Sequence, residues 1–422
     1  MKVMVINCGS SSLKFKLFDM AQESQLLAEG QVEAIGAEQS VFHYSTFQMK
    51  PKGALKLNVK AADHTEAVET VARTLLDPEV GLFEGTIPVD AVGHRVVHGG
   101  EMFSKSALIT KGVKEVIEAC SDLAPLHNPP NLAGIVACEK IFPNVPQVAV
   151  FDTAFHQTMP KRAYIYGIPY EYYERYHIRK YGFHGTSHEY VSLRTAELLS
   201  RDVKQLKIVT CHLGNGASIT AVRHGQSVET SMGFTPLQGL LMGTRTGDID
   251  AAVVLYLMDK EHLDSKAMND LLNKKSGLKG ISGVSNDLRE VMEQAKHGNE
   301  RCQLAVDSMT YRIKRYIASY AAAMGGIDAI AFTGGIGENA AEVREKVLTP
   351  LEFMGIRLDL AKNFDSAKEK IISTDDSPVK VLVVPTNEEL VIANKTRALI
   401  EEESSHPVVT ARHDSMRPEP PQ

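Results

Sequence analysis

The chain has 422 residues, of which 43% are hydrophobic and 23% are charged, the balance of an ordinary globular protein. This composition excludes collagen-like, mucin-like and wholly disordered chains, and the length predicts two or three domains at roughly 100–200 residues each. The 46 basic and 52 acidic side chains leave a net charge of −6, so we expect neither a nucleic-acid nor a membrane partner. An anion that binds here must be held by a few placed cations.

The five cysteines are scattered, and no two of them form a CxxC pair, so neither a disulfide framework nor a zinc ribbon is expected. The N-terminus has only four apolar residues in a row, at 3–6, whereas a secretory leader needs about 7–15. The longest apolar run, 251–258, is far shorter than the roughly 18 residues of a membrane span. These patterns predict a cytoplasmic protein.

The first part of the chain has the pattern of a β-hairpin followed by a helix and further strands. Residues 3–6 form an apolar run, and residues 13–17 alternate apolar side chains with lysines after a small polar turn. Residues 65–76 place apolar side chains on one face of a helix. Residues 91–97 and 145–151 are apolar runs that end in polar residues, which is typical of buried strands.

The second part of the chain repeats this hairpin pattern. Residues 207–211 and 217–222 read as two strands joined by a glycine-rich turn, so the sequence indicates a weak structural repeat. Residues 300–324 give the strongest helical pattern and end at two glycines. Residues 329–332 and 379–384 read as later strands, and the alternation of strands and helices predicts α/β layering.

The C-terminal segment 404–422 is rich in serine, proline and charged residues. Such a composition cannot bury enough apolar surface to offset the entropy of ordering. We therefore expect a disordered tail there.

Three small-residue turns follow predicted strands, at residues 7–12, 212–216 and 334–339. Glycine lets a backbone approach an oxyanion closely, and successive N–H groups form an anion-binding nest. One such turn is most simply a plain hairpin, but three at the carboxyl ends of strands favour a ligand site, because open α/β sheets bind ligands at that edge. The sequence has no P-loop and no complete GxGxxG, so any phosphate chemistry uses another scaffold.

Several charged residues lie in unusual places along the sequence. Arg95 and Arg245 are flanked by Gly or Thr, and a guanidinium suits phosphate or carboxylate, although a structural ion pair fits each position as well. Asp152 and Glu388 follow predicted strands, where a carboxylate can hold Mg²⁺, act as a base or cap the next segment. His184 has a histidine four residues later, but Gly185 argues against the helix that a zinc pair would need.

At these motifs the sequence resembles a known family. Residues 5–14 resemble the first signature of the acetate kinases, and residues 212–218 resemble the second. The stretches around Arg95, Asp152, His184, Arg245, 287–289 and 334–339 follow in the family order, and the resemblance covers about residues 1–400.

The resemblance implies the fold of the superfamily of sugar kinases, actin and heat-shock chaperone ATPases. This is an α/β fold of two duplicated actin-like, ribonuclease H-like domains with a nucleotide cleft between them. The first domain would comprise 1–152 plus 386–403, and the second, with the nucleotide site, 153–385. The two predicted hairpins would be the two phosphate loops of the duplicated fold. The resemblance also implies a homodimer.

The implied reaction is the reversible, Mg²⁺-dependent, direct in-line transfer of the ATP γ-phosphoryl group to acetate, giving acetyl phosphate and ADP. Arg95 would grip the acetate carboxylate, and Arg245 and His184 would stabilise the transferring phosphoryl group. The family assigns proton transfer to Asp152, but a carboxylate acceptor is already ionised near neutral pH and needs no base. We therefore expect Asp152 to orient Mg²⁺-bound water or Arg95.

The resemblance also implies three sets of binding residues. Mg²⁺, for which Mn²⁺ can substitute, would be held by Asn7 and Glu388. The methyl group of acetate would lie among Val97, Leu126, Phe183 and Pro236. The residues expected to bind ATP or ADP are Lys14, His212, Leu213, Gly214, Asn215, Gly216, Asp287, Leu288, Arg289, Gly335, Ile336, Gly337, Glu338 and Asn339.

Two alternatives remain open at the level of sequence. A kinase for propionate or butyrate differs by a methylene group or two, and one methylene in an apolar pocket changes binding by only about 1–3 kcal/mol. A non-catalytic, nucleotide-gated actin-like protein would keep the phosphate loops but would need no cations for an acceptor. The combination of Arg95, His184 and Arg245 favours the kinase.

Overall fold

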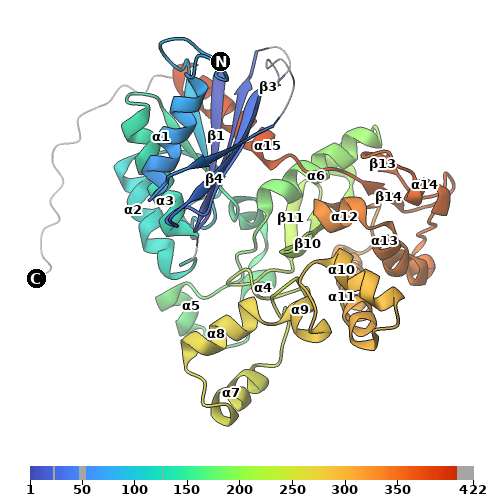
Figure 1. The fold of residues 1–422 in the computed structure, drawn as a ribbon. Helices are drawn as coiled ribbons and strands as arrows, with labels where there is room; N and C mark the ends of the chain where they lie inside the picture. Colours follow the sequence, from blue (N-terminus) through green and yellow to red (C-terminus); the bar gives the residue numbers. More distant parts are fainter. Residues whose placement is uncertain (22–23, 47–53, 126, 406–422) are drawn as a thin grey trace, which may run out of the picture.

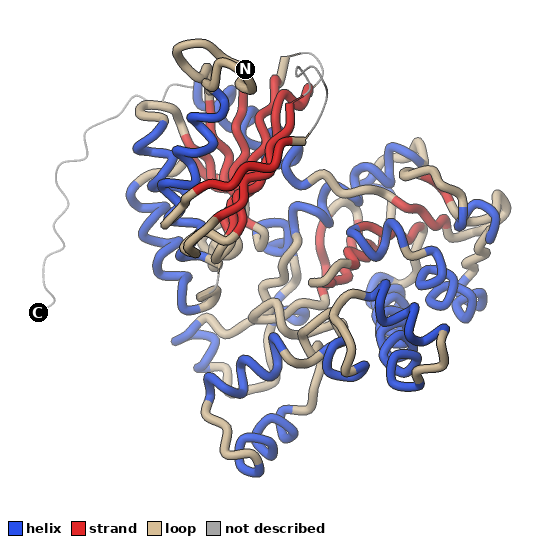
Figure 2. Tube along the Cα trace, viewed as in Figure 1, coloured by secondary structure: helices blue, strands red, loops and turns tan. Residues whose placement is uncertain are grey.

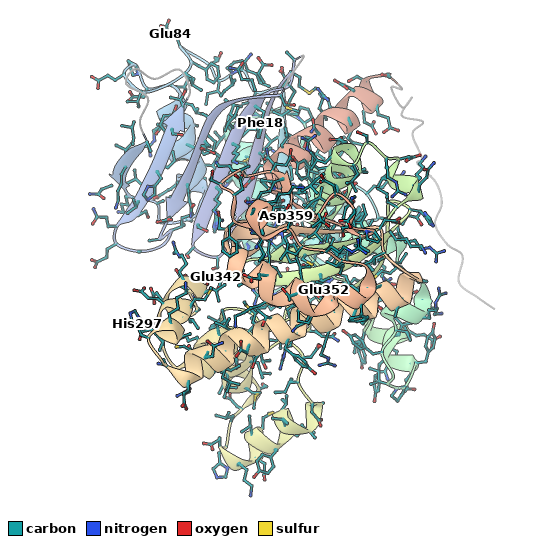
Figure 3. The ribbon with its side chains drawn as sticks, turned by 90° about the vertical axis from the view of Figure 1, so that its right-hand side faces the viewer. Phe18, Glu84, His297, Glu342, Glu352 and Asp359 are labelled. Carbon is teal, nitrogen blue, oxygen red and sulfur yellow. The ribbon has the colours of Figure 1, made fainter. Side chains whose placement is uncertain are left out.

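The computed structural model describes residues 1–21, 24–46, 54–125 and 127–405, which form two lobes, each built around one β-sheet (Figures 1 and 2). The side view of Figure 3 shows the first lobe, marked by Phe18 and Glu84, above the second lobe, marked by His297 and Glu352. Among the described residues, no helix combines the length and the apolar character that crossing a bilayer requires.

The sheet of the first lobe has eight strands in the order β5-β4-β3-β2-β1-β6-β8-β7. Strands β1 to β5 pair antiparallel in sequence order, whereas β1, β6 and β8 run parallel and β7 pairs antiparallel with β8. The bounds are β1 (Lys2–Cys8), β2 (Ser12–Asp19), β3 (Gln25–Glu33), β4 (Ser40–Thr46), β5 (Leu55–Val59), β6 (Ala91–Val96), β7 (Ala107–Leu108) and β8 (Gln147–Phe151).

The sheet of the second lobe has six strands in the order β11-β10-β9-β12-β14-β13. Its bounds are β9 (Lys207–Leu213), β10 (Ala217–Arg223), β11 (Gln226–Thr230), β12 (Ala329–Thr333), β13 (Lys370–Ile371) and β14 (Lys380–Val383). Strands β9, β12 and β14 run parallel, and the run β11-β10-β9-β12-β14 repeats the run β3-β2-β1-β6-β8 of the first sheet. The predicted duplication is therefore confirmed.

Helices cover both sheets. Their bounds are α1 (His64–Leu75), α2 (Lys111–Ala119), α3 (Asn128–Ile141), α4 (Lys161–Tyr164), α5 (Glu171–Tyr176), α6 (Gly185–Leu198), α7 (Ala251–Lys260), α8 (Ser265–Lys274), α9 (Gly277–Ser282), α10 (Leu288–Lys296), α11 (Glu300–Met324), α12 (Gly334–Asn339), α13 (Ala341–Leu348), α14 (Leu360–Phe364) and α15 (Glu388–Ser405). Four 3-10 turns are η1 (Cys120–Asp122), η2 (Ala154–Thr158), η3 (Val203–Gln205) and η4 (Thr349–Met354).

The first sheet buries its two faces under different parts of the chain. Met4 and Ile6 of β1 pack in one core cluster with residues of α1 and α3. Val3 and Val5, on the opposite face of the same strand, pack with Ile392 of α15. Figure 1 shows α15 behind the sheet, so the last described helix returns to the first lobe. The division of the chain into domains at 152 and 386 stays a prediction.

Helix α15 ends later than the sequence indicated. It runs through Ser404 and Ser405, so the prediction that the tail begins at residue 404 is wrong for these two residues. Both serines fit into the helix because their hydroxyls donate hydrogen bonds to the carbonyl oxygens of Ile400 and Glu401, one turn earlier. The rest of the predicted tail lies outside the described residues.

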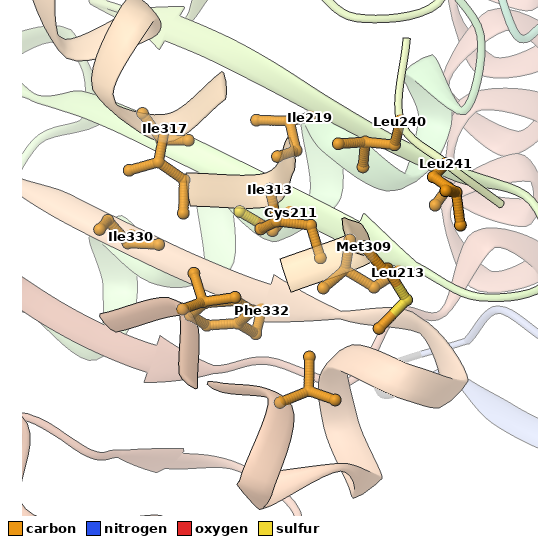
Figure 4. Close-up of a cluster of buried hydrophobic side chains, with 14 of the residues drawn as sticks. Cys211, Leu213, Ile219, Leu240, Leu241, Met309, Ile313, Ile317, Ile330 and Phe332 are labelled. Carbon is orange, nitrogen blue, oxygen red and sulfur yellow. The ribbon is translucent and has the colours of Figure 1, made fainter. Parts of the chain in front are cut away.

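The core of the second lobe lies between its sheet and α11 (Figure 4). Cys211 of β9, Ile219 of β10 and Phe332 of β12 face Ile313 and Ile317 of this helix (Figure 4). The predicted helix is confirmed at both ends, because an asparagine side chain caps its N-terminus and a glycine in the left-handed conformation follows Met324. All five cysteines are buried and unpaired.

Two predictions of local structure are wrong. Residues 334–339, expected as a turn, form α12, because the carboxylate of Glu338 accepts a hydrogen bond from Gly334 N at 2.9 Å and closes the helical turn. Helix α6 begins at Gly185, although this glycine argued against a helix. Its Cβ would lie 2.2 Å from the carbonyl oxygen of Asp152, so a close backbone contact selects glycine there.

Gly93 lets α15 lie close to the first sheet, and this contact gives a test of the fold. A Cβ on Gly93 would lie 2.4 Å from Thr396 Oγ1 and 2.8 Å from Ile392 Cγ2. We expect Gly93→Ala to lower the unfolding free energy by about 1–3 kcal/mol, because a packed interface must shift. Chemical denaturation measures the change, with the open position Gly167→Ala as control. Equal stability of the two variants would contradict the packing.

Candidate functional site

The ends of the parallel strands in the first sheet bring three predicted residues together. Asn7 lies near the end of β1, Arg95 near the end of β6, and Asp152 follows β8 directly. These strands are neighbours in the sheet, so their carboxyl ends share one edge. The structure thus places an amide, a guanidinium and a carboxylate side by side.

Arg95 and Asp152 form a two-point ion pair. Nε of Arg95 donates to Oδ1 of Asp152 at 3.1 Å, and Nη2 donates to Oδ2 at 2.5 Å. Nη1 of Arg95 reaches Asn7 Oδ1 at 3.4 Å. Burial opposes the charge of Arg95, but the carboxylates of Asp152 and Glu388 outweigh it and raise the pKa of the guanidinium. The pair therefore holds Arg95 charged in one orientation.

Glu388, the first residue of α15, carries a carboxylate without a counter-ion. Among the described residues, no hydrogen bond or ion pair engages its side chain. Burial raises its pKa to about 7, Arg95 opposes this shift, and the carboxylates of Asp152 and Glu389 add to it. A cation beside this carboxylate would favour its ionised form.

His184 stands directly before α6 in the left-handed conformation, with φ of 56°. A non-glycine residue in this region is strained, and such strain is typical of functional sites. The ring stacks on that of His212, with 4.2 Å between the centroids. Burial, then the charges of His212, His188, Arg95 and Arg245, hold the pKa of His184 well below its usual value.

His184 and Arg245 converge over the second glycine turn. A Cβ on Gly216 would lie 3.6 Å from Arg245 Nη1 and 3.8 Å from both Nε2 and Cε1 of His184. Arg245 donates to the carbonyl of Pro236 at 3.2 Å, and no carboxylate pairs with it in the described part of the chain. Its guanidinium keeps donors for a ligand, and the missing side chain of Gly216 leaves the space for one.

The charge of Arg95 extends into the same region from the first lobe. Burial lowers the pKa of His212 to about 4, and the charge of Arg95 adds to this effect. His127 shows the same effect of burial, followed by the charges of Arg95 and Arg245, and its pKa also lies at about 4. Arg95, Arg245 and His184 therefore border one region rather than three separate ones, with His184 as a neutral ring between the two guanidinium groups.

Part of the predicted apolar pocket lies beside these groups. Val97 and Phe183 pack in the same buried cluster. The carbonyl oxygen of Pro236 accepts a hydrogen bond from Arg245. Leu126 lies outside the described residues. Apolar side chains in this region suit a short apolar group attached to an anion.

A cavity of about 1260 Å³ opens on the second lobe next to the glycine turns. The predicted nucleotide residues that line it are Gly214, Asn215, Asp287, Leu288, Arg289, Gly335, Ile336, Glu338 and Asn339. Its further walls come from α10, α13 and the segment after α14, all in the second lobe. The volume is above the range of about 300–1,000 Å³ that is usual for small-molecule pockets.

Five predicted nucleotide residues do not line this cavity. Lys14 lies on β2 in the first sheet, where its charge lowers the pKa of Glu388. The ring of His212 stacks on that of His184, and Gly216 lies next to the His184 ring. Leu213 packs in the hydrophobic core, so its side chain is structural. Gly337 is buried in α12 and accepts a hydrogen bond through its carbonyl oxygen.

The sequence analysis missed residues that position this site. Asn131 of α3 donates to the carbonyl of Cys8 at 2.8 Å and accepts from Val97 N at 3.0 Å, so it ties the first phosphate turn to the predicted pocket. Its signal was the run of asparagines and prolines at 128–131, which starts a buried helix. Arg344 of α13 donates to carbonyl oxygens of α12, and nothing in its sequence context indicates this.

The two lobes touch at Asp152. Gly185 N, at the start of α6, donates to the Asp152 carbonyl oxygen at 3.0 Å. Asp152 therefore holds Arg95 through its side chain and the segment of His184 through its backbone. This joint sets the spacing between the groups of the first lobe and those of the second.

Comparison with known proteins shows the family to which the chain belongs. The model of the acetokinase family matches residues 2–394. The acetate kinase of Thermoanaerobacter pseudethanolicus is 56% identical over 401 residues, covering 95% of this chain and 99% of the relative. That of Halothermothrix orenii is 54% identical, covering 95% of this chain and the whole of the relative.

Solved structures show the same likeness. The Porphyromonas gingivalis acetate kinase matches with a TM-score of 0.90 at 49% identity, covering 94% of this chain and 99% of that one. A propionate kinase from Francisella tularensis matches with a TM-score of 0.87 at 42% identity and the same coverage. By sequence, fold and family model, this chain belongs to the acetokinase family.

Proposed function

We propose that this protein catalyses the reversible, Mg²⁺-dependent transfer of the ATP γ-phosphoryl group to acetate, giving acetyl phosphate and ADP. The observation that carries the proposal is the convergence of Arg245 and His184 over Gly216, next to Arg95 and to a nucleotide-sized cavity. Membership of a family whose relatives are acetate kinases supports the choice of reaction.

Acetate binds through its charge and its methyl group. Arg95 receives the carboxylate, and the bond to Asp152 keeps the guanidinium in the required orientation. Val97, Phe183 and Pro236 supply the apolar wall for the methyl group. The resemblance also assigns Leu126 to methyl binding, and this residue lies outside the described ranges.

The nucleotide occupies the cavity of the second lobe. Residues of α10 and α12 line the wall for the adenosine part, and the glycine turn at Gly214 and Gly216 leads the phosphate chain toward His184. Lys14 and His212, which lie outside the cavity wall, remain candidates for the terminal phosphates. The γ-phosphoryl group then lies between the two lobes.

Transfer is a direct displacement by the acetate oxygen. The terminal P–O bond of ATP breaks as the new P–O bond forms, and the transferring group carries its charge on three equatorial oxygens. Arg245 and His184 donate to these oxygens from fixed positions. No general base is needed, because acetate is ionised near neutral pH.

The donor set near Arg95 fits Mg²⁺. Mg²⁺ takes one or two carboxylates with phosphate oxygens and waters, and the unpaired carboxylate of Glu388 lies with Asn7 and Asp152 in this region. Within the described ranges, no group of three or more acidic, histidine or cysteine side chains forms a metal site by itself. When bound with the nucleotide, the ion neutralises phosphate charge; Mn²⁺ has the same preference for oxygen ligands.

Two alternatives are weighed against this proposal. A propionate kinase is among the solved relatives, at 42% identity, so the first alternative is a kinase that prefers a longer acid. That preference would depend on the size of the apolar pocket, because one added methylene changes binding only modestly. A nucleotide-gated assembly protein would have no use for the unpaired guanidinium of Arg245. Values of kcat/KM for acetate, propionate and butyrate separate the first alternative from the proposal.

The proposed reaction predicts an acyl phosphate that hydroxylamine traps as a hydroxamate. We expect the product only when ATP, Mg²⁺ and acetate are all present. Arg245→Ala should lower kcat about 10²–10³-fold, because it removes a donor to the transition state. Arg223→Ala removes an exposed guanidinium at the end of β10 and serves as control. Absence of hydroxamate in the wild type would refute the function.

The Arg95–Asp152 pair predicts a second kinetic result. Asp152→Asn should raise the Mg²⁺ concentration needed for half-maximal rate more than it shifts the acidic limb of the pH–rate profile. The physical reason is that Asp152 orients Arg95 and metal-bound water instead of transferring a proton. Asp90→Asn, which alters a carboxylate that only accepts from Lys2 N, is the control. Loss of an acidic pKa at unchanged Mg²⁺ response would contradict this.

We also propose that the protein is a homodimer and that it works in the cytoplasm. None of the residues of α7 is buried, and Leu255 and Tyr256 are 69% and 61% exposed on a helix that projects from the second lobe (Figure 1). An exposed apolar helix of this kind is typical of a protein interface. Five reduced thiols are compatible with a reducing compartment.

The exposed helix predicts which substitution disrupts the dimer. Leu255→Asp should halve the mass measured by light scattering, because a buried charge opposes the apolar interface. Phe353→Asp, on a side chain that is 80% exposed in η4, should leave the mass unchanged. A monomeric wild type, or a dimer that survives Leu255→Asp, would contradict the proposal.

A further inference from the structure

The face of the second sheet that packs on α6 is apolar in part, but next to His188 it carries polar side chains where packing alone would favour apolar ones. Alternation along β9 and β10 sends Thr210, Ser218 and Thr220 to this face, opposite His188 of α6. All four side chains are buried. Burying polar groups is costly unless each is hydrogen-bonded, so this layer needs a reason beyond stability.

Three of these side chains, those of Thr210, His188 and Ser218, form one continuous chain of short hydrogen bonds that ends at His184. Thr210 Oγ1 lies 2.7 Å from His188 Nδ1, and His188 Nε2 lies 2.7 Å from Ser218 Oγ. Ser218 Oγ lies 2.9 Å from Nδ1 of His184. The other ring nitrogen, Nε2 of His184, faces the space over Gly216 that Arg245 also borders.

The hydroxyl of Ser218 decides how this chain runs. A hydroxyl has one proton to donate but can accept two hydrogen bonds, and a neutral imidazole has one N–H and one acceptor nitrogen. If Ser218 donates to Nδ1 of His184, then His188 must donate to Ser218 and Thr210 must donate to His188. If Nδ1 of His184 donates to Ser218 instead, His188 can either accept from Ser218 or donate to it as well. A His184 ring that carries its proton on Nε2 therefore fixes the tautomer of His188.

The surroundings keep both imidazoles neutral. Burial is the main cause that holds the pKa of His188 well below its usual value, and His156 and His212 add to it. His184 faces His212, His188, Arg95 and Arg245, all of which disfavour a further positive charge. His184 can then donate from Nε2 only if its single proton is on that nitrogen.

We propose that Ser218 and His188 are positioning residues that direct this chain toward His184 and so keep its proton on Nε2. The inference rests on the proposed function, because a phosphoryl oxygen at that position requires a donor. The opposite direction would gain only the bond from Thr210 Oγ1 to the carbonyl of Thr220, which is long at 3.4 Å. A neutral donor also avoids a third positive charge beside the two arginines.

The ring nitrogens of His184 give a direct spectroscopic test. In wild-type protein labelled with ¹⁵N-histidine, we expect the His184 resonances of a neutral ring protonated at Nε2, assigned by their absence in His184→Gln. Ser218→Ala removes the donor to Nδ1 and should produce a mixture of tautomers. A wild-type ring protonated at Nδ1, or a mixture that Ser218→Ala leaves unchanged, would overturn the inference.

Kinetics give the second test, with a matched control. Ser218→Ala should lower kcat for acetyl phosphate formation about tenfold, with little change in KM for ATP because the cavity is untouched. Thr220→Val removes a buried hydroxyl from the same strand face, which bonds Thr230 and not the chain, and should keep kcat. Equal kcat in the two variants would refute the positioning role.

Variants of His188 add a rescue test that does not depend on Ser218. The amide of His188→Gln can donate to Ser218, so this variant should retain more activity than His188→Leu, provided that both melt cooperatively. Equal losses in two folded variants would count against the proposal. A wild type without kinase activity would instead remove the proposed function, and the tautomer of His184 would still be measurable.

Discussion

The whole site depends on Asp152, which is fully buried where the two lobes meet. Its carboxylate holds Arg95 at two points, and its carbonyl oxygen accepts from the first residue of α6. A buried carboxylate is tolerated because it is paired with a guanidinium. The same residue therefore orients Arg95 and sets the spacing to His184, so its role is mechanical as well as electrostatic.

The second sheet divides these tasks between its faces. The face toward α11 is apolar and supplies stability through a large core. The face toward α6 carries hydroxyls and imidazoles that bond one another and reach His184. Because side chains alternate along a strand, β9 and β10 take part in both layers at once. The catalytic edge is thus supported by residues that never touch a substrate in the proposal.

The fold was predictable where the signal is local, and the site only in part. Apolar runs and glycine turns located both hairpins, and helix α11 was predicted from its periodicity and final glycines. Helix α6 was missed because a contact distant in sequence, with Asp152, favours glycine at its start, and α12 was missed because a local side-chain contact, from Glu338 to Gly334 N, offsets the low helix propensity of glycine. Asn131 was missed since its partners, Cys8 and Val97, are adjacent only in the folded chain.

The position of α15 has a consequence for synthesis on the ribosome. The face of the first sheet formed by Val3, Val5, Val148 and Val150 is covered by Ile392, which is translated more than 200 residues after the last of these strands. At about 5–20 residues per second, this interval lasts on the order of 10–50 s. During that time the nascent first lobe carries an uncovered apolar surface, which is a natural target for chaperones.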